Sequence, residues 1–341
     1  MMIPEFLNLI WVSSQLAFFL FIPGFLLQNA FARERGYNLS FSESLFLWSA
    51  TSVTVSGIIA MLLAYFGVFS LINLSLAIVT LIAITWWIRR PQLTVPNPKL
   101  TLNSTFLLLT ILLAVHLFFM PFEWILGGGD PGTYMNTGFH IARKGSVFVI
   151  DDLLGTVDGE VERYLYSNAQ YLGYYITNRS SGEVVPQFLY LYPSIIAIFY
   201  SIGGLNLSLF TTPFLAILSL MAIYLATKEI FNTRVALISL ILLTTNFLII
   251  WGARQPNSEV LVRLLLFSGI YALSLYFKTK NNFYTALSAL FFGGMLLTRI
   301  DAWMMILPMF FILIMLQNSS NKHRSSLTFV GTFLALYFTG W

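Results

Sequence analysis

The sequence predicts an all-α polytopic membrane protein with about ten transmembrane helices and a large first external loop that contains short amphipathic helices. Two observations carry this prediction. Hydrophobic residues make up 57% of the chain and charged residues only 9%, whereas soluble domains contain roughly 25% charged residues. Several apolar runs also reach the roughly 20 residues that a helix needs to cross a bilayer. No nucleic-acid-binding motif is visible, and the lack of cysteine excludes thiol chemistry.

The expected spans follow the apolar runs in order. The first run has no basic segment before it and no small-residue cleavage site, so we expect a retained helix. Segment 188–204 is not counted as a span, because it is short, contains Pro193 and ends in two glycines, which favours a dipping or interfacial segment. The spans are predicted at 6–28, 44–66, 71–88, 104–122, 209–227, 234–251, 260–277, 283–298, 302–316 and 326–341.

Basic residues in the short loops predict the orientation of these spans. Positive residues stay preferentially in the cytoplasm, and all five basic clusters fall there only if 188–204 does not cross. Segment 123–208 then becomes a large external loop that folds back onto the membrane. The clusters are Arg33 and Arg35; Arg89, Arg90 and Lys99; Lys228 and Arg234; Lys278 and Lys280; and Lys322 and Arg324.

A short helix is predicted at the start of this loop, directly after three glycines. Asp130 would be its N-cap, Pro131 its first residue and Gly145 its C′ residue. A carboxylate held at a helix N-terminus beside a membrane is suited to act as a base on an acceptor hydroxyl. Helix capping alone would also explain Asp130, and the two roles are compatible. An apolar face expected to lie on the membrane is formed by Met135, Gly138, Phe139 and Ala142.

Further charges are predicted at the outer helix ends, on the same side as Asp130. Charge within a membrane span is costly, so such residues are functional candidates; snorkelling to lipid headgroups or pairing between helices would also explain them. The i, i+4 spacing lets Arg263 pair with Glu259. The residues at the outer ends are Arg254, Glu259, Arg299 and Asp301.

The loop also carries acidic and aromatic residues that have simple structural explanations. The acidic run that begins at Asp151 is typical of a solvated loop, although it could hold a metal or a saccharide. Its tyrosines suit both sugar stacking and a membrane interface. His140 lies on the short helix, where it could face the site, but no second ligand follows at metal spacing.

The order of several motifs resembles GT-C superfamily glycosyltransferases, in particular those related to protein O-mannosyltransferases and lipopolysaccharide sugar transferases. The likeness covers about 104–341. Gly-Gly-Asp-Pro-Gly-Thr-Tyr at 128–134, followed by Ala-Arg-Lys-Gly at 142–145, resembles their first external loop. The other matching segments are Tyr-Leu-Tyr-Pro at 190–193, Tyr-Leu-Ala-Thr-Lys-Glu-Ile-Phe at 224–231, Arg-Gln-Pro-Asn-Ser-Glu at 254–259 and Leu-Thr-Arg-Ile-Asp-Ala at 297–302.

The resemblance implies a hexosyl or pentosyl transferase in the plasma membrane, with its active site on the external face. It would move a sugar from a polyprenyl- or dolichyl-phosphate donor to a glycan, lipid or protein acceptor, with inversion. Asp130 matches the catalytic aspartate of the family and would be the base. The donor phosphate would be held by Arg254, Arg263 and Arg299, and the acceptor or sugar by Tyr134, His140, Tyr192 and Glu259.

The resemblance leaves the need for a metal open. The oligosaccharyltransferase branch has an acidic pair where this chain has Asn257 and Glu259. Hard cations prefer carboxylates, so the asparagine weakens such a site and favours a donor used without an obligatory metal. We therefore expect no cofactor, or else a divalent cation, Mg or Mn, held by Asp130 and Glu259.

The domain organisation is predicted from the extent of the resemblance. Residues 1–100 do not fit the family and are interpreted as an N-terminal three-helix membrane element, with 101–341 as the GT-C-like core. The chain stops inside an apolar run at Trp341, which suggests a C-terminal truncation. Two alternative functions remain: a polytopic transporter or lipid flippase, and a noncatalytic scaffold derived from the enzyme.

Overall fold

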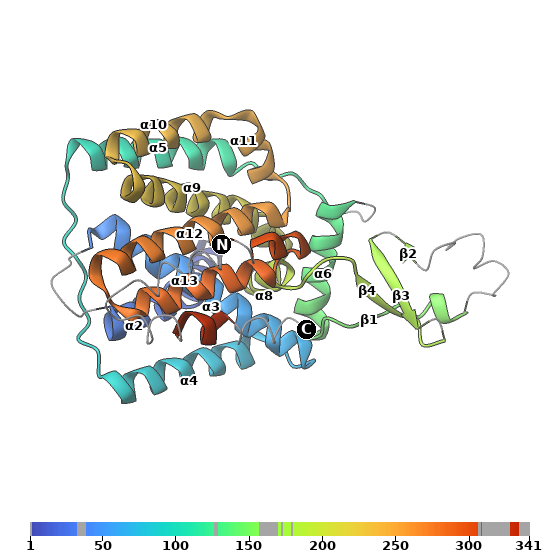
Figure 1. The fold of residues 1–341 in the computed structure, drawn as a ribbon. Coiled ribbons are helices and arrows are strands. Elements are labelled where there is room, and N and C mark those ends of the chain that lie inside the picture. The colour runs from blue at the N-terminus through green and yellow to red at the C-terminus, as the bar shows by residue number, and fades with distance from the viewer. Residues whose placement is uncertain are drawn as a thin grey trace.

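The structure is a computed structural model that describes residues 2–32, 39–125, 129–156, 170–171, 173–178, 180–305, 308 and 328–333. It is mostly helical, and a small sheet projects from one end of a helical bundle (Figure 1). The helices are α1 (Met2–Leu20), α2 (Ile22–Phe31), α3 (Phe41–Tyr65), α4 (Leu71–Arg89), α5 (Leu102–Phe118), α6 (Asp130–Lys144), α8 (Leu191–Leu209), α9 (Thr211–Ile230), α10 (Thr233–Thr245), α11 (Phe247–Arg254), α12 (Ser258–Thr279) and α13 (Asn282–Leu296).

Apart from α8, the apolar helices of the described residues coincide with the expected spans. Among the described residues, six helical segments are long and apolar enough to cross a membrane, and the bent pair α10–α11 makes up to seven. Helices α5 and α13 are apolar but shorter, with 17 and 15 residues. The last two expected spans, 302–316 and 326–341, lie largely outside the described residues.

Helix α8 differs from the expectation that 188–204 is too short to span, since 19 residues form an apolar helix that could cross a membrane by length and composition. The first part of α8, however, packs along α6 in the same direction: Ile196 lies against Gly138, and the Tyr200 hydroxyl bonds Arg143. Figure 1 shows α6 lying across one end of the bundle, which we call the α6 end. Gly203 and Gly204 have non-helical φ/ψ angles and divide α8 near its C-terminal end.

The described basic residues of the short loops lie at the end of the bundle opposite α6. Figure 1 shows the C-terminal ends of α4, α9 and α12 together on that side. Arg89 ends α4, while Lys228 and Lys278 lie in the last turns of α9 and α12. The fold therefore separates these cations from Asp130, which begins α6.

The loop between α6 and α8 contains a sheet, which corrects the all-α prediction. Four antiparallel strands are ordered β1-β4-β3-β2. Tyr174–Asn178 is rich in aromatic and β-branched residues, which favour extended backbone. Gly182 has a φ of +69° and lies so close to the Asp151 carbonyl that a side chain would collide with it. The strands are β1 (Val149–Ile150), β2 (Gln170–Tyr171), β3 (Tyr174–Asn178) and β4 (Glu183–Pro186), and the 3-10 turns are η1 (Leu154–Thr156) and η2 (Ile300–Met305).

The N-terminal helices share one hydrophobic core with the rest of the described chain. Helix α3 packs against α8, α9 and α13. Helices α2 and α3 approach closely at Gly24, where an added Cβ would lie 2.1 Å from the Trp48 carbonyl oxygen. Residues 1–100 are thus packed into the bundle through α3.

Candidate functional site

Asp130 is the first residue of α6, and its side chain is exposed at the helix N-terminus. Gly129 is the N-cap, so the prediction that Asp130 caps the helix is wrong, and no side chain caps this end. Gly145 ends the helix in the left-handed conformation, with a φ of +75°, as expected. The Asp130 carboxylate is therefore not engaged in capping, and the helix dipole favours its negative charge. Of the glycines before it, Gly127 and Gly128 lie outside the described residues.

The face of α6 that we expected to lie on a membrane is buried in protein instead. Met135 and Phe139 are buried, and Phe139 packs against Tyr200 with ring centroids 4.7 Å apart. Gly138 contacts Ile196, and an added Cβ would come within 2.6 Å of its side chain. Sequence periodicity identified the apolar face, but its partner is helix α8. This packing holds α6, and with it Asp130, against the bundle.

Tyr134 lies one helical turn after Asp130 and is 3% exposed. Its hydroxyl hydrogen-bonds the Ser258 Oγ at 2.8 Å. Its ring stacks on Phe188 with centroids 4.4 Å apart, and the Tyr192 ring meets it edge-on at 5.1 Å. Burial raises the pKa of Tyr134 to about 12, so the hydroxyl stays neutral near pH 7. Tyr134 is therefore a buried packing and hydrogen-bonding residue beneath the exposed part of the site.

Arg299 lies across from α6 and pairs with two carboxylates; we call Glu259, Arg299 and Asp301 the Arg299 cluster. Its Nη1 donates to the Glu259 Oε1 at 2.5 Å. Nε and Nη2 donate to the two oxygens of Asp301 at 2.8 and 3.1 Å, which is a bidentate pair. The expected pairing of Glu259 with Arg263 is thus wrong, because Glu259 turns to Arg299. Both carboxylates are exposed, Glu259 to 62% and Asp301 to 59%.

Charge in this cluster is coupled to α6. The Asp301 carboxylate, followed by the Glu259 charge, raises the pKa of Arg299, and Arg299 in turn lowers the pKa of Asp301. Asp130, Glu259 and Arg299 each act on the pKa of the Tyr134 hydroxyl, so all three charges lie within electrostatic range of Tyr134. Carboxylates outnumber guanidinium groups here. No group of three or more potential metal ligands of the His, Cys, Asp or Glu type occurs in the described part of the chain.

The other two arginines predicted to hold phosphate lie apart from the cluster. Arg263 points between α12 and α9, where its Nε donates to the Ser219 Oγ at 3.0 Å. Its Nη2 is buried and has no hydrogen-bond partner among the described residues. The Arg254 Nε donates to the Leu117 carbonyl at 2.8 Å, at the end of α5. Arg254 therefore ties α11 to α5.

Two of the predicted acceptor-binding residues have other partners. The His140 Nε2 hydrogen-bonds the Phe148 carbonyl at 2.8 Å, at the base of the sheet. Burial lowers the pKa of His140, so the ring is neutral near pH 7. Tyr192 is fully buried, and its hydroxyl bonds to the Thr212 Oγ1 at 2.6 Å. Among the predicted acceptor-binding residues, only Glu259 is exposed beside Arg299.

Sequence reasoning missed Ser258, which the structure places between α6 and the Arg299 cluster. It is fully buried, and its Oγ bonds both the Tyr134 hydroxyl and the Arg299 Nη1, the latter at 3.3 Å. Its position beside Glu259, directly after the N-cap Asn257, was the available signal. The partners could not be read from the sequence, because Tyr134 lies 124 residues away.

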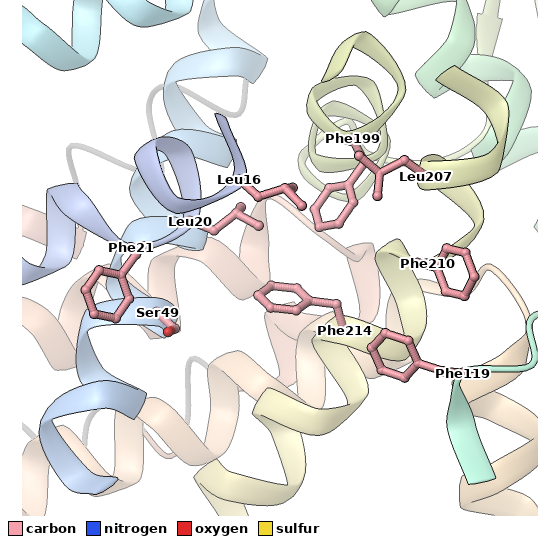
Figure 2. Close-up of a pocket in the computed structure, with 9 residues that line it drawn as sticks. All are labelled: Leu16, Leu20, Phe21, Ser49, Phe119, Phe199, Leu207, Phe210 and Phe214. Atoms are coloured by element: carbon pink, nitrogen blue, oxygen red, sulfur yellow. The ribbon is translucent and has the colours of Figure 1, made fainter. Parts of the chain in front are cut away.

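An apolar cavity of about 490 Å³ lies between the N-terminal helices, α8 and α9. Figure 2 shows Leu16 and Leu20 on one side of this space, with Phe199 and Leu207 across from them. Phe214 of α9 lines the cavity two residues after Thr212, whose hydroxyl bonds Tyr192 of α8. The remaining lining residues are Phe21, Ser49, Phe119 and Phe210.

Comparison with protein families gives a match over the second half of the chain. Residues 187–340 match the family model described as dolichyl-phosphate-mannose-protein mannosyltransferase. Comparison with curated proteins found no match, and comparison with solved structures found none either. The matched segment contains the Arg299 cluster and Ser258, whereas Asp130 and Tyr134 precede it. Residues 187–340 therefore form a domain of this glycosyltransferase family, which is of the GT-C type.

Proposed function

We propose that this protein is an inverting membrane glycosyltransferase that uses a polyprenyl-phosphate sugar, with Asp130 as its base. One observation carries the proposal: the exposed carboxylate of Asp130 acts on the same buried hydroxyl, that of Tyr134, as Glu259 and Arg299 do, and these two residues lie in the segment that matches the family. The name of the family supports a dolichyl-phosphate-linked sugar as donor and a protein as acceptor. The acceptor of this chain is proposed more broadly as a glycan, lipid or protein hydroxyl.

The proposed reaction is a single displacement at the anomeric carbon. Asp130 accepts the proton of the acceptor hydroxyl while the oxygen of that hydroxyl forms a bond to the anomeric carbon. The bond from that carbon to the phosphate oxygen breaks, and polyprenyl phosphate leaves with the bonding electrons. Attack from the face opposite the phosphate inverts the configuration. A guanidinium such as Arg299 would stabilise the charge on the departing phosphate.

Donor binding has to change the Arg299 cluster, because Glu259 and Asp301 already occupy Arg299. A phosphate would compete with these carboxylates for the guanidinium. Arg263, whose Nη2 is buried without a partner among the described residues, is proposed as a second phosphate contact. A divalent cation held by Asp130 and Glu259 is the alternative way to balance the phosphate charge.

Membrane placement follows from the same arrangement. The basic loop residues gather opposite the α6 end, so we place the α6 end on the external face of the plasma membrane. Helices α6 and α8 would then lie at that surface, within the external loop 123–208, and about ten spans would form the rest. The isoprenoid chain of the donor would occupy the apolar cavity of Figure 2, which is embedded among membrane helices.

Sugar transfer in proteoliposomes tests the proposal, with a panel of polyprenyl-phosphate sugars and acceptors, in the presence and absence of EDTA. Asp130→Asn is expected to reduce transfer by roughly 100- to 10,000-fold, the usual contribution of a general base. Asp152→Asn is the matched control, since Asp152 is an exposed aspartate of the same loop outside the site. Full transfer by Asp130→Asn would remove Asp130 from the mechanism. Transport of the labelled lipid without sugar transfer would instead identify a flippase.

A further inference from the structure

We propose that Ser258 is a positioning residue of this site, which sets Arg299 against the helix that carries Asp130. The proposal rests on the proposed function, because the position of Arg299 matters only if Arg299 stabilises the departing phosphate. A continuous hydrogen-bond chain runs from the Tyr134 hydroxyl through the Ser258 Oγ and the Arg299 Nη1 to the Glu259 Oε1. It joins α6, α12 and the segment after α13.

Helix capping does not account for the Ser258 hydroxyl. Asn257 is the N-cap of α12, and its side chain accepts from the Val260 N–H at 3.2 Å. The Asn257 Nδ2 also donates to the Gly252 carbonyl at 2.7 Å, which fixes the turn before α12. The start of the helix is thus secured by Asn257, and the Ser258 side chain is left to bond groups from other elements.

The Ser258 hydroxyl links Arg299 to Tyr134 by bonding both. A guanidinium only donates, so the Ser258 Oγ accepts from Arg299. The same Oγ bonds the Tyr134 hydroxyl at 2.8 Å, and either of the two hydroxyls can be the donor, because the serine oxygen has a second lone pair and its own hydrogen. One buried hydroxyl can therefore satisfy both partners at once, and a hydrogen bond to a charged group is stronger than a neutral one. Alanine at this position would leave both partners without that bond.

The position of Asp130 depends on this link through α6. Asp130 and Tyr134 are separated by four residues, so they lie one above the other on the same face of the helix. The Tyr134 ring is held by Phe188 and Tyr192, and its hydroxyl is therefore a fixed point. Because Ser258 connects this point to Arg299, it sets the distance between the base and the cation. Small errors in such distances are costly to catalysis.

Steady-state transfer in proteoliposomes tests the proposal, with wild type, Ser258→Ala and Ser288→Ala compared at equal amounts of folded protein. Ser288 is the matched control: it is fully buried and its hydroxyl bonds the Gly269 carbonyl at 2.9 Å, within the α12–α13 contact. We expect Ser258→Ala to lower kcat/KM for the donor roughly 10- to 100-fold, as the loss of a hydrogen bond to a charged group predicts. Ser288→Ala should match the wild type.

Two further variants separate positioning from simple packing. Ser258→Thr keeps the hydroxyl and is expected to retain transfer. Tyr134→Phe keeps the stacked ring but removes the other end of the bond, so it should lower kcat/KM in the same direction as Ser258→Ala. The double variant should lose less than the product of the single losses, because both changes break the same chain. If Ser258→Ala does not fold, Ser258→Thr and Tyr134→Phe carry the test.

The outcomes distinguish this inference from the proposed function. The positioning role would be overturned if Ser258→Ala and Ser288→Ala had equal kcat/KM, or if Tyr134→Phe had the kcat/KM of the wild type. The proposed function would still stand in that case, provided that the wild type transfers sugar and Asp130→Asn does not. Independent, fully multiplicative losses in the double variant would also overturn it. Wild-type protein that transfers no sugar would overturn both together.

Discussion

Both ends of the helical bundle carry ion pairs, but they bury their carboxylates to different degrees. At the end opposite α6, Glu43 pairs with Lys228 at 2.6 Å and is only 5% exposed. Glu229 pairs there with Lys278 and is 3% exposed. At the α6 end, Glu259 and Asp301 pair with Arg299 while each is more than half exposed. Ion pairs of the same kind thus occur with buried carboxylates at one end of the bundle and with exposed carboxylates at the other.

The difference indicates which pairs hold helices together and which remain available to a ligand. Glu43 also accepts from the Ser40 N–H in a capping box, so this carboxylate is bound on both sides. Removing one partner of a buried pair leaves an uncompensated charge and is strongly destabilising. Exposed pairs contribute little to stability. The α6 end can therefore exchange partners on ligand binding, while the opposite end cannot do so without a large cost.

The largest effect that would sharpen this comparison is expected from Arg299→Lys. Lysine keeps the charge but cannot make the bidentate pair with Asp301 while it also contacts Glu259 and Ser258. We expect kcat/KM for sugar transfer to fall roughly 10- to 100-fold, with little change in stability. Arg234→Lys, an exposed arginine at the opposite end, is the control in the same transfer assay. Equal activity of the two variants would contradict a functional role for the Arg299 geometry.

A second effect concerns stability. Glu43→Gln keeps an oxygen for the capping box but removes the negative charge that pairs with Lys228, whose side chain is 30% exposed, so the free energy of unfolding should fall by about 2 kcal/mol. Glu259→Gln, the matched change at the α6 end, should cost less than about 1 kcal/mol because that pair is exposed. Chemical denaturation in detergent micelles measures both. A larger loss in Glu259→Gln than in Glu43→Gln would reverse the comparison.

The smallest expected effect is a pH dependence at the junction of α6 and the sheet. Burial lowers the pKa of His140 below its ordinary value of 6.5, so the unfolded chain binds a proton more readily than the folded one. The stability from neutral His140 is therefore complete above that value and is lost as the pH falls through the folded pKa. We expect faster proteolysis of the 146–186 region at pH 5.5 than at pH 7.5. The His140→Gln variant should not show this difference, because glutamine can donate to Phe148 without titrating.

Local physical rules account for what the sequence alone determined. The low charge and the apolar runs located the candidate spans of the described residues other than α8, because a bilayer imposes length and hydropathy on each helix separately. Pro131 and Gly145 marked the ends of α6 to within one residue. Asp130, Arg299 and Glu259 were singled out because charge is rare in such a chain and its position is informative.

Tertiary packing decided the rest, since the relevant partners are distant in the sequence. Glu259 had a possible partner four residues away in Arg263, but the fold pairs it with Arg299, forty residues away. The apolar face of α6 could have met lipid or protein, and α8 covers it. Ser258 became part of the site only because α6 brings Tyr134 to it. Periodicity and composition describe one element at a time, whereas these contacts depend on how the elements are arranged in space.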